Sequence, residues 1–197
     1  ERRGAKTGLI TTEGFGDSLE IAREKKYSLY DVKNKKPEPL VPRSLRHEAR
    51  ERLAANGDIK TALDIDSLKA AAKKLVNDGV SSIAVVFLHA YSNPIHEKKA
   101  IAFLTDQYPQ LSTTASSDVA PEIREYERAS TTVANAYIKP LAASYLDLMA
   151  SKINNKGIDP ELHMMISSGG LTHVAEAKRT PVQMLESGPA AAALAGA

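Results

Sequence analysis

The densest group of potentially reactive side chains in this sequence is a charged run from Glu122 to Arg128. Within it, Glu125 and Glu127 are candidates for a general base or a metal ligand, provided that they lie in a cleft. The same pattern fits a solvated helix whose charges pair three and four residues apart, which is the simpler interpretation. The catalytic residues therefore stay unassigned, with Glu125 and Glu127 as the candidates.

A second group follows a short apolar segment, residues 162–166, that we predict to be a strand. The loop after this strand contains two adjacent glycines, and α/β proteins bind ligands at the ends of their strands. An ordinary glycine turn also explains the loop. Nearby polar residues, 130–132 and Asn135, either line a pocket or pack and cap a helix. The predicted substrate-binding residues are Ser168, Gly169, Gly170 and Asn135.

A third group is the Ser-Gly-Pro-Ala segment near the end of the chain, where a small-residue helix is predicted to begin. Free backbone N–H groups and the helix dipole favour an anion at such a position. A tight turn whose small residues permit close helix packing is the alternative. The predicted cofactor-binding residues are Ser187, Gly188, Pro189 and Ala190.

The histidines do not form a recognisable metal site. His89, His96 and Glu97 match no standard zinc spacing, so a structural role is the preferred interpretation, and no metal ligands are predicted. The sequence also lacks the G-x-S-x-G, H-E-x-x-H and G-x-x-x-x-G-K-[ST] motifs. Serine hydrolases, zincins and P-loop enzymes therefore lose support.

Composition narrows the class of protein further. The 197 residues are 43% hydrophobic and 25% charged, which is typical of a globular α/β protein. The net charge of +2 comes from scattered basic residues, so we expect no nucleic-acid partner. Cysteine is absent, which excludes disulfides and thiolate metal sites and suits a reducing compartment. No apolar run approaches a membrane span and no signal peptide is present, so we expect a cytoplasmic protein without a membrane partner.

Hydrophobic patterning places these groups on α/β elements. An apolar run over residues 82–90 predicts a strand buried on both faces, between two amphipathic helices. Asn56-Gly57-Asp58 predicts the turn of a hairpin. The order of strands and helices predicts βαβ units and a largely parallel sheet. The elements predicted before residue 120 are strands over 6–12, 45–53, 59–63, 82–90 and 112–119, and helices over 17–24, 65–76 and from 94 onward, with an exposed loop over 33–42.

The second part of the chain has a more helical pattern. Residues 122–153 predict two helices that meet near Lys139-Pro140, because proline removes a helical hydrogen bond. Short strands are predicted over 162–166 and 182–185, before the helix that starts near Ser187. We place a domain boundary between residues 120 and 135.

Several strings, taken together, resemble the hydantoinase A/5-oxoprolinase family, which also includes acetone carboxylase subunits. They cover nearly the whole chain in the family's order. The strings are ERRGAKTGLITTEGFGD, PEPLVPRSLR, FLHAYSNPIHE, PEIREYERASTTVANAYIKP, SSGG and SGPAAAALAGA. The resemblance implies an α/β fold of the ribonuclease-H-like actin/Hsp70/sugar-kinase type, with a mixed sheet and flanking helices. Residues 1–130 would be part of the N-terminal lobe and 131–197 the start of the catalytic lobe.

The resemblance also implies chemistry. A family enzyme would use ATP and Mg²⁺ to phosphorylate the carbonyl oxygen of a cyclic amide, which water then opens. Hydantoins and 5-oxoproline are the expected substrates, and Ser187–Ala190 would lie near the nucleotide. The alternatives are an ATP-dependent ketone carboxylase subunit and a non-catalytic actin-like binding module. A second subunit of the hydantoinase B type and a homo-oligomer are the expected partners.

This sequence departs from the family pattern at several points. It lacks both Asp-Gly-Gly-Thr-type phosphate loops, so we expect an internal fragment that is inactive alone and holds no cofactor. Ser168 stands where the family often has Asn, and Ala129 stands where Thr is expected. At these two positions the substrate contacts are therefore expected to differ from those of the family.

Overall fold

The computed structural model describes residues 2–23, 30–31, 33, 37–157 and 161–196. Contacts within the chain divide it into two compact units, residues 6–136 and residues 1–5 with 137–197. Residue 24 of the predicted helix 17–24, and parts of the predicted loop 33–42, lie outside the described residues. No helix among the described residues is both long enough and apolar enough to cross a membrane.

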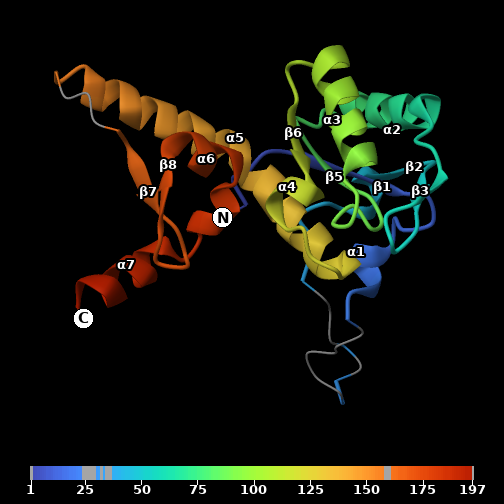
Figure 1. Ribbon diagram of the computed structural model, residues 1–197, viewed down its shortest axis with the longest axis horizontal. Helices are drawn as coiled ribbons and strands as arrows, with labels where there is room; N and C mark the ends of the chain where they lie inside the picture. The colour runs from blue at the N-terminus through green and yellow to red at the C-terminus, as the bar shows by residue number, and fades with distance from the viewer. Residues whose placement is uncertain (1, 24–29, 32, 34–36, 158–160, 197) are drawn as a thin grey trace. The chain divides into compact units, whose positions relative to one another are not determined.

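The unit of residues 6–136 is built on a four-stranded parallel sheet with the order β2-β1-β5-β6 (Figure 1). Every residue of the two central strands is buried, as expected for strands covered on both faces. This confirms the predicted parallel α/β core, although the apolar run that begins at Ser82 leaves the sheet after Val86. The strands are β1 (Thr7–Thr12), β2 (Arg46–Ala49), β5 (Ser82–Val86) and β6 (Ser112–Ala115).

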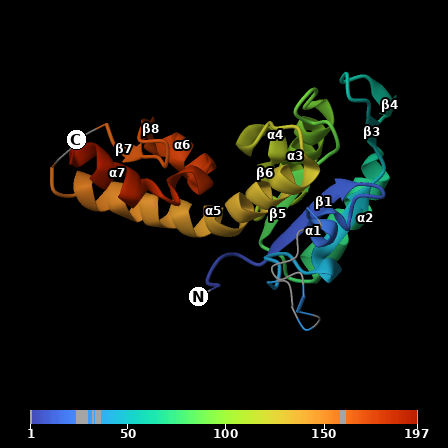
Figure 2. The same cartoon turned by 90° about the horizontal axis from the view of Figure 1, so that it is seen from below.

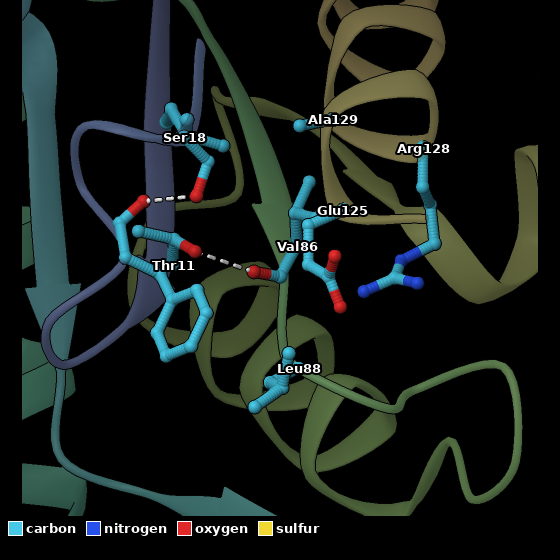
Figure 3. A pocket seen from close by; sticks show the side chains of 9 residues that line it. Thr11, Ser18, Val86, Leu88, Glu125, Arg128 and Ala129 are labelled. Carbon is cyan, nitrogen blue, oxygen red and sulfur yellow. Dashed lines mark hydrogen bonds between the residues drawn. The ribbon is translucent and has the colours of Figure 1, made fainter. Parts of the chain in front are cut away.

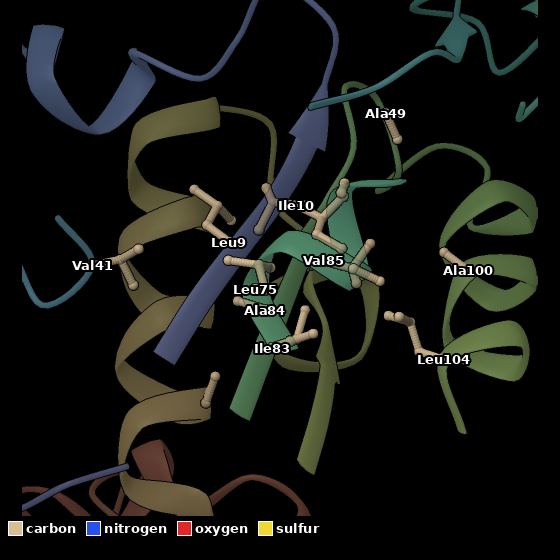
Figure 4. Packing of buried hydrophobic residues seen from close by; sticks show 14 of the residues in the cluster. Leu9, Ile10, Val41, Ala49, Leu75, Ile83, Ala84, Val85, Ala100 and Leu104 are labelled. Atoms are coloured by element: carbon tan, nitrogen blue, oxygen red, sulfur yellow. The ribbon is translucent and has the colours of Figure 1, made fainter. Parts of the chain in front are cut away.

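Helices cover the two faces of this sheet. Helices α2 (Ile65–Asn77) and α3 (Ile95–Gln107) pack against one face, where a Cβ on Gly8 would meet the side chain of Leu75 at 2.6 Å. The first turns of α5 cover the other face, where Ser82 Oγ donates to the carbonyl of Ala136. Figure 4 shows the apolar side chains that fill the space between them. Asp64 accepts from the backbone N–H groups of two residues in the first turn of α2 and so caps this helix.

The predicted hairpin is only partly correct. Residues 46–49 do not belong to it, because they form the edge strand β2 of the main sheet, where Arg46 and Ala49 are buried. Only β3 (Arg52–Leu53) pairs antiparallel with β4 (Ile59–Thr61). Gly57 adopts φ +89° in the intervening turn, as the Asn-Gly-Asp signal predicted. The short helices before it are α1 (Ser18–Ile21) and the 3₁₀ turn η1 (Arg43–Leu45).

Helix α5 runs without interruption from Glu125 to Asn154, so the prediction of two helices meeting at Pro140 is wrong. Proline has no N–H to donate to the carbonyl four residues earlier, which belongs to Ala136. Ser82 Oγ donates to that carbonyl instead, at 2.7 Å. The next carbonyl, of Tyr137, accepts from the backbone N–H of Ala5 at 2.9 Å. These outside donors explain how the helix tolerates an internal proline.

The unit that contains residues 137–197 adds smaller elements to the second part of α5 (Figure 2). Strand β7 (His163–Met165) pairs antiparallel with β8 (Leu171–His173), so the predicted strand here is confirmed and its partner was missed. The predicted strand over 182–185 is wrong, because Pro181 starts a 3₁₀ turn, η2 (Pro181–Met184). The remaining helices are α4 (Ser116–Val119), which belongs to the first unit, α6 (Val174–Arg179) and α7 (Ser187–Ala195).

Candidate functional site

The carboxyl ends of β1, β5 and β6 lie at one edge of the parallel sheet, where α/β proteins bind their ligands. Buried polar side chains gather here from the strand ends and from helices α3 and α5. Each of them is at most 3% exposed: Thr12, Glu51, His96, Glu97, Ser116 and Arg128. Such groups are costly to bury unless they are hydrogen-bonded, so their partners define the architecture of this edge.

Glu97 joins the ends of two strands. Its Oε1 accepts from the backbone N–H of Phe87 at 2.9 Å and from the hydroxyl of Ser116 at 2.6 Å. Its Oε2 accepts from the backbone N–H of Ser117 at 2.8 Å. Burial raises the pKa of the Glu97 carboxyl, and these hydrogen bonds partly oppose the effect. One carboxyl group thus holds the chain leaving β5 against the chain leaving β6.

A second set of hydrogen bonds ties β1 to the same edge. The hydroxyl of Thr12 accepts from the backbone N–H of Leu88 at 2.8 Å and donates to Glu51 Oε1. Glu51 Oε2 lies 2.7 Å from His96 Nδ1. All the polar atoms named here are therefore engaged with one another, which supports the predicted structural role of His96.

Arg128 is the buried cation of this edge. Its Nη1 donates to the carbonyl of Glu122 at 2.8 Å and its Nη2 to the carbonyl of Phe87 at 3.0 Å. The guanidinium also lies over the ring of Tyr91, 5.5 Å from its centroid. Burial lowers the pKa of Arg128, and the carboxylates of Glu97 and Glu125 oppose this shift. The remaining nitrogen, Nε, is buried and has no hydrogen-bond partner among the described residues.

A small pocket opens between the sheet and the first turns of α5 (Figure 3). Its empty volume is ≈ 270 Å³, including the part open to solvent. In Figure 3, the Glu125 carboxylate and the Arg128 guanidinium lie next to each other on one side of this space. The pocket is lined by Leu9, Thr11, Phe15, Ser18, Val86, Leu88, Glu125, Arg128 and Ala129.

The two catalytic candidates have different surroundings. Glu125 lines the pocket, whereas Glu127 does not and instead pairs with Arg23. The backbone N–H of Glu127 itself and the Arg23 side chain hold the pKa of the Glu127 carboxyl below its ordinary value. For Glu127 this favours the surface ion-pair interpretation. Asn135 is buried and does not line the pocket.

The predicted glycine loop and the predicted anion site lie together in the second unit. Gly169 adopts φ +86° in the turn between β7 and β8, and a Cβ on it would meet Leu194 of α7 at 3.1 Å. The hydroxyl of Ser167 accepts from the backbone N–H of Glu186, immediately before α7. These contacts bring Ser168, Gly169 and Gly170 close to the segment Ser187–Ala190, although neither segment lines the pocket described above.

Sequence reasoning missed Thr12, Glu51 and the part played by Arg128. Thr12 and Glu51 have their partners far away in the chain, and Arg128 is tied to Phe87, 41 residues away, so local spacing gave no signal for these contacts. The described part of the chain contains no group of three or more His, Asp or Glu side chains placed to hold a metal ion.

A parallel sheet with helices on both faces and buried charges at its carboxyl edge places this chain in the α/β class, whose members commonly bind ligands at that edge. Two family models cover most of the chain. Residues 1–107 match the hydantoinase/oxoprolinase N-terminal region, and residues 128–197 match the hydantoinase/oxoprolinase model. The chain therefore belongs to the hydantoinase/oxoprolinase family, as its sequence strings indicated.

Characterised relatives support this assignment. The chain is 33% identical to the caprolactamase alpha subunit of Pseudomonas jessenii over its full length, and spans 28% of that subunit. It is 28% identical to the 5-oxoprolinase of Saccharomyces cerevisiae, over 96% of this chain and 16% of the yeast protein. The chain thus spans less than a third of the length of these relatives.

Solved structures agree with the sequence matches. The crystal structure of the ATP-dependent caprolactamase from Pseudomonas jessenii matches 98% of this chain and 28% of its own, with a TM-score of 0.89 and 33% identity. The nucleotide-free structure of acetone carboxylase matches 96% of this chain and 28% of its own, with a TM-score of 0.83 and 25% identity. The predicted α/β fold class is confirmed.

Proposed function

We propose that this chain is part of an ATP-dependent enzyme that opens small cyclic amides through a phosphorylated intermediate. The observation that carries the proposal is the match over nearly the whole chain to an ATP-dependent caprolactamase, in both sequence and structure. The similarity to a 5-oxoprolinase points to the same reaction, since both of these relatives are named for cyclic amides. Hydantoins and 5-oxoproline-type rings are the substrates proposed for the complete enzyme.

ATP with Mg²⁺ is the proposed cofactor, and it would supply the phosphoryl group that activates the amide oxygen. The backbone at the predicted anion site, Ser187–Ala190, suits a phosphate group only in part. A Cβ on Gly188 would meet nothing within 4 Å, so the backbone there is open to a ligand. However, Pro189 has no N–H, the N–H of Ala190 already donates to the carbonyl of Glu186, and the Glu186 side chain is itself an anion. We therefore keep Ser187 and Gly188 as the stronger donors of this proposed site.

The buried edge of the sheet has a supporting role in this proposal. The Glu97 and Thr12–Glu51–His96 hydrogen bonds fix the chain where it leaves β5, and this chain forms one wall of the pocket. Rigid walls keep a substrate in one orientation, which lowers the entropic part of the barrier to reaction. We also propose that residues 1–130 belong to the N-terminal lobe of the enzyme and residues 131–197 to its catalytic lobe.

A ketone carboxylase is the second candidate, because the acetone carboxylase structure also matches this chain closely. Both reactions would use ATP to activate an oxygen atom, so the fold alone does not separate them. A non-catalytic binding module is the third. A partner subunit of the hydantoinase B type is proposed, since the caprolactamase relative is itself named as a subunit. The absence of cysteine favours the cytoplasm as the location.

The test uses the complete gene product, purified with any subunit that accompanies it. We expect ATP hydrolysis to rise when a hydantoin, 5-oxoproline or a simple lactam is added, and the ring-opened acid to appear. Turnover of a ketone that requires bicarbonate would instead identify the carboxylase. ATP hydrolysis that no substrate changes, or its absence, would contradict both enzymatic proposals and favour a binding module.

Titration with Mg·ATP tests the cofactor proposal separately. We expect binding by the complete gene product and none by the 197-residue chain, which lacks both phosphate-loop motifs. Tight binding by the 197-residue chain would show that the nucleotide site lies within it.

A further inference from the structure

The second part of α5 exposes three large apolar side chains. Leu141 is 57% exposed, Tyr145 63% and Leu148 55%. They are four and three residues apart in the sequence. At about 100° per residue they therefore fall within an arc of about 60° on the helix, and we call them the apolar stripe. Exposed apolar side chains that are scattered singly need no explanation, whereas a contiguous patch of them marks an interaction site.

The unit to which this part of α5 belongs uses another side of the helix. Leu146 is buried, and Asp147 pairs with Lys178 of α6. Figure 1 and Figure 2 show β7, β8, α6 and α7 gathered on one side of this part of α5. Ser144 and Ser151 are also exposed, so a polar sector lies beside the stripe on the outer surface of the helix. Water suits the polar sector, but the described residues leave the apolar stripe without a cover.

The spacing of the stripe indicates the shape of the segment that covers it. Apolar side chains three and four residues apart are the pattern with which one helix packs against another. The same spacing continues back to Ile138, which is half-buried, and forward to Lys152, which is exposed. Ala142 and Ser144 flank the stripe and are small, so a second helix axis can approach to about 8–10 Å. The stripe therefore fits a helix with apolar side chains at the same spacing and an acidic side chain facing Lys152.

We infer that the apolar stripe is the docking surface for a helix of the same polypeptide, supplied by the part of the complete gene product outside these 197 residues. The chain spans 28% of the caprolactamase alpha subunit and 16% of the yeast 5-oxoprolinase, so most of the length of such relatives is available to supply this helix. A tethered segment acts at a high effective concentration, which lets a small surface hold it. The inference concerns the assembly of the chain and does not depend on the proposed function.

A second copy of the chain suits the stripe less well. Three side chains, each a little over half exposed, provide much less than the area of about 800 Å² per partner that a stable complex buries. An antiparallel pair of helices centred on Tyr145 would place Lys152 against Ile138 of the other copy, and burying a charge against an apolar side chain is unfavourable. A parallel pair would place the two copies of Lys152 against each other.

Cysteine labelling of the complete gene product tests the inference. Leu148→Cys places a thiol in the stripe, and Ser151→Cys is the matched control in the polar sector; the 197 residues contain no other cysteine. Each thiol is followed with a maleimide by mass spectrometry of its own peptide. We expect the thiol at position 148 to react at least about tenfold more slowly than the control, because a covered site reacts only when the structure opens. This protection should persist on dilution and without any accompanying subunit.

Equal labelling of the two positions would overturn the inference, and so would protection of both, because the cover would then not select the stripe. Protection that is lost on dilution would identify a second copy as the occupant, and protection that requires another subunit would identify that subunit; either result overturns the intramolecular helix. If circular dichroism shows that Leu148→Cys does not fold, hydroxyl-radical footprinting of the wild type replaces it. Tyr145 should then be oxidised more slowly than in a synthetic peptide of residues 141–152, and equal oxidation would overturn the inference.

Discussion

The hydrogen bond from Ser82 to α5 offers a direct test of how this helix contains a proline. Ser82 is fully buried, and its hydroxyl donates to the Ala136 carbonyl at 2.7 Å, the carbonyl that Pro140 leaves without its helical donor. Ser82→Ala removes this donor and leaves a buried carbonyl unsatisfied. Such a loss costs about 1–3 kcal/mol. The hydroxyl also lies 3.3 Å from the Ser112 carbonyl, a longer contact that adds little.

The second variant in this experiment is Pro140→Ala, which restores an N–H at the position that normally donates to the Ala136 carbonyl. In the Pro140→Ala background, Ser82→Ala should therefore cost less than about 0.5 kcal/mol, because the carbonyl keeps a partner. The coupling between the two substitutions should be about 0.5–2.5 kcal/mol, within the range for residues that share a partner.

Urea unfolding followed by far-UV circular dichroism measures all four proteins of this cycle. The m-values should agree, so that differences in midpoint report stability. Ser81→Ala is the matched control, because Ser81 is exposed on the neighbouring position and should change stability little. If Ser82→Ala costs the same with and without Pro140, the serine does not compensate for the proline and our explanation of the unbroken helix is wrong.

Three further predictions concern the same unit. His96→Ala should destabilise the fold by about 1–3 kcal/mol in urea unfolding, because it removes the hydrogen bond between His96 and the buried Glu51 Oε2, while Thr12 still donates to Oε1; a loss below about 0.5 kcal/mol would contradict the importance of this hydrogen bond. Glu97 has a raised pKa, so its contribution to stability is greatest below its ordinary pKa of 4.5 and is lost as the pH rises through its folded value. The stability of the wild type relative to Glu97→Gln should therefore fall from pH 4 toward neutrality in urea titrations at several pH values, and a rise would refute the assigned shift. Gly8→Ala should cost about 1–3 kcal/mol, because its Cβ would meet the buried Leu75 at 2.6 Å, whereas Gly79→Ala has free space and reports only the strain of φ +73°.

Much of the sheet could be predicted from the sequence because its signals are local. The strand that begins at Ser82 and the helix after Asp64 depend on neighbouring residues, and both are present, although the strand ends at Val86, earlier than predicted. The edge strand at Arg46 was misassigned to a hairpin. Its sequence is polar, so no apolar pattern indicated that it pairs in parallel with β1. Helix α5 was divided at Pro140, because the serine that replaces the missing donor lies 54 residues from Ala136 in the sequence.

The candidate site was predictable to a lesser extent. The charge cluster pointed to Glu125, which does line the pocket, but gave Glu127 equal weight. Arg128 stood in the same cluster and was not chosen, because its burial depends on the carbonyl of Phe87, 41 residues away. Thr12 and Glu51 are separated by 39 residues and each looks unremarkable alone. Only the fold shows that these residues share one edge of the sheet.

The hydrogen bonds at that edge also differ in the length of chain that each must close, which bears on the order of folding. Those of Glu97 span 10 to 20 residues and lie within the segment from β5 to the start of α4. The bonds from His96 to Glu51 and from Leu88 to Thr12 span 45 and 76 residues. Because the entropy lost on closing a loop grows with its length, the β5-α3-β6 segment is favoured to form first. On this ordering β1 and β2 join a preformed template, and the pocket, whose walls come from β1, β5 and α5, is completed only at the end of folding.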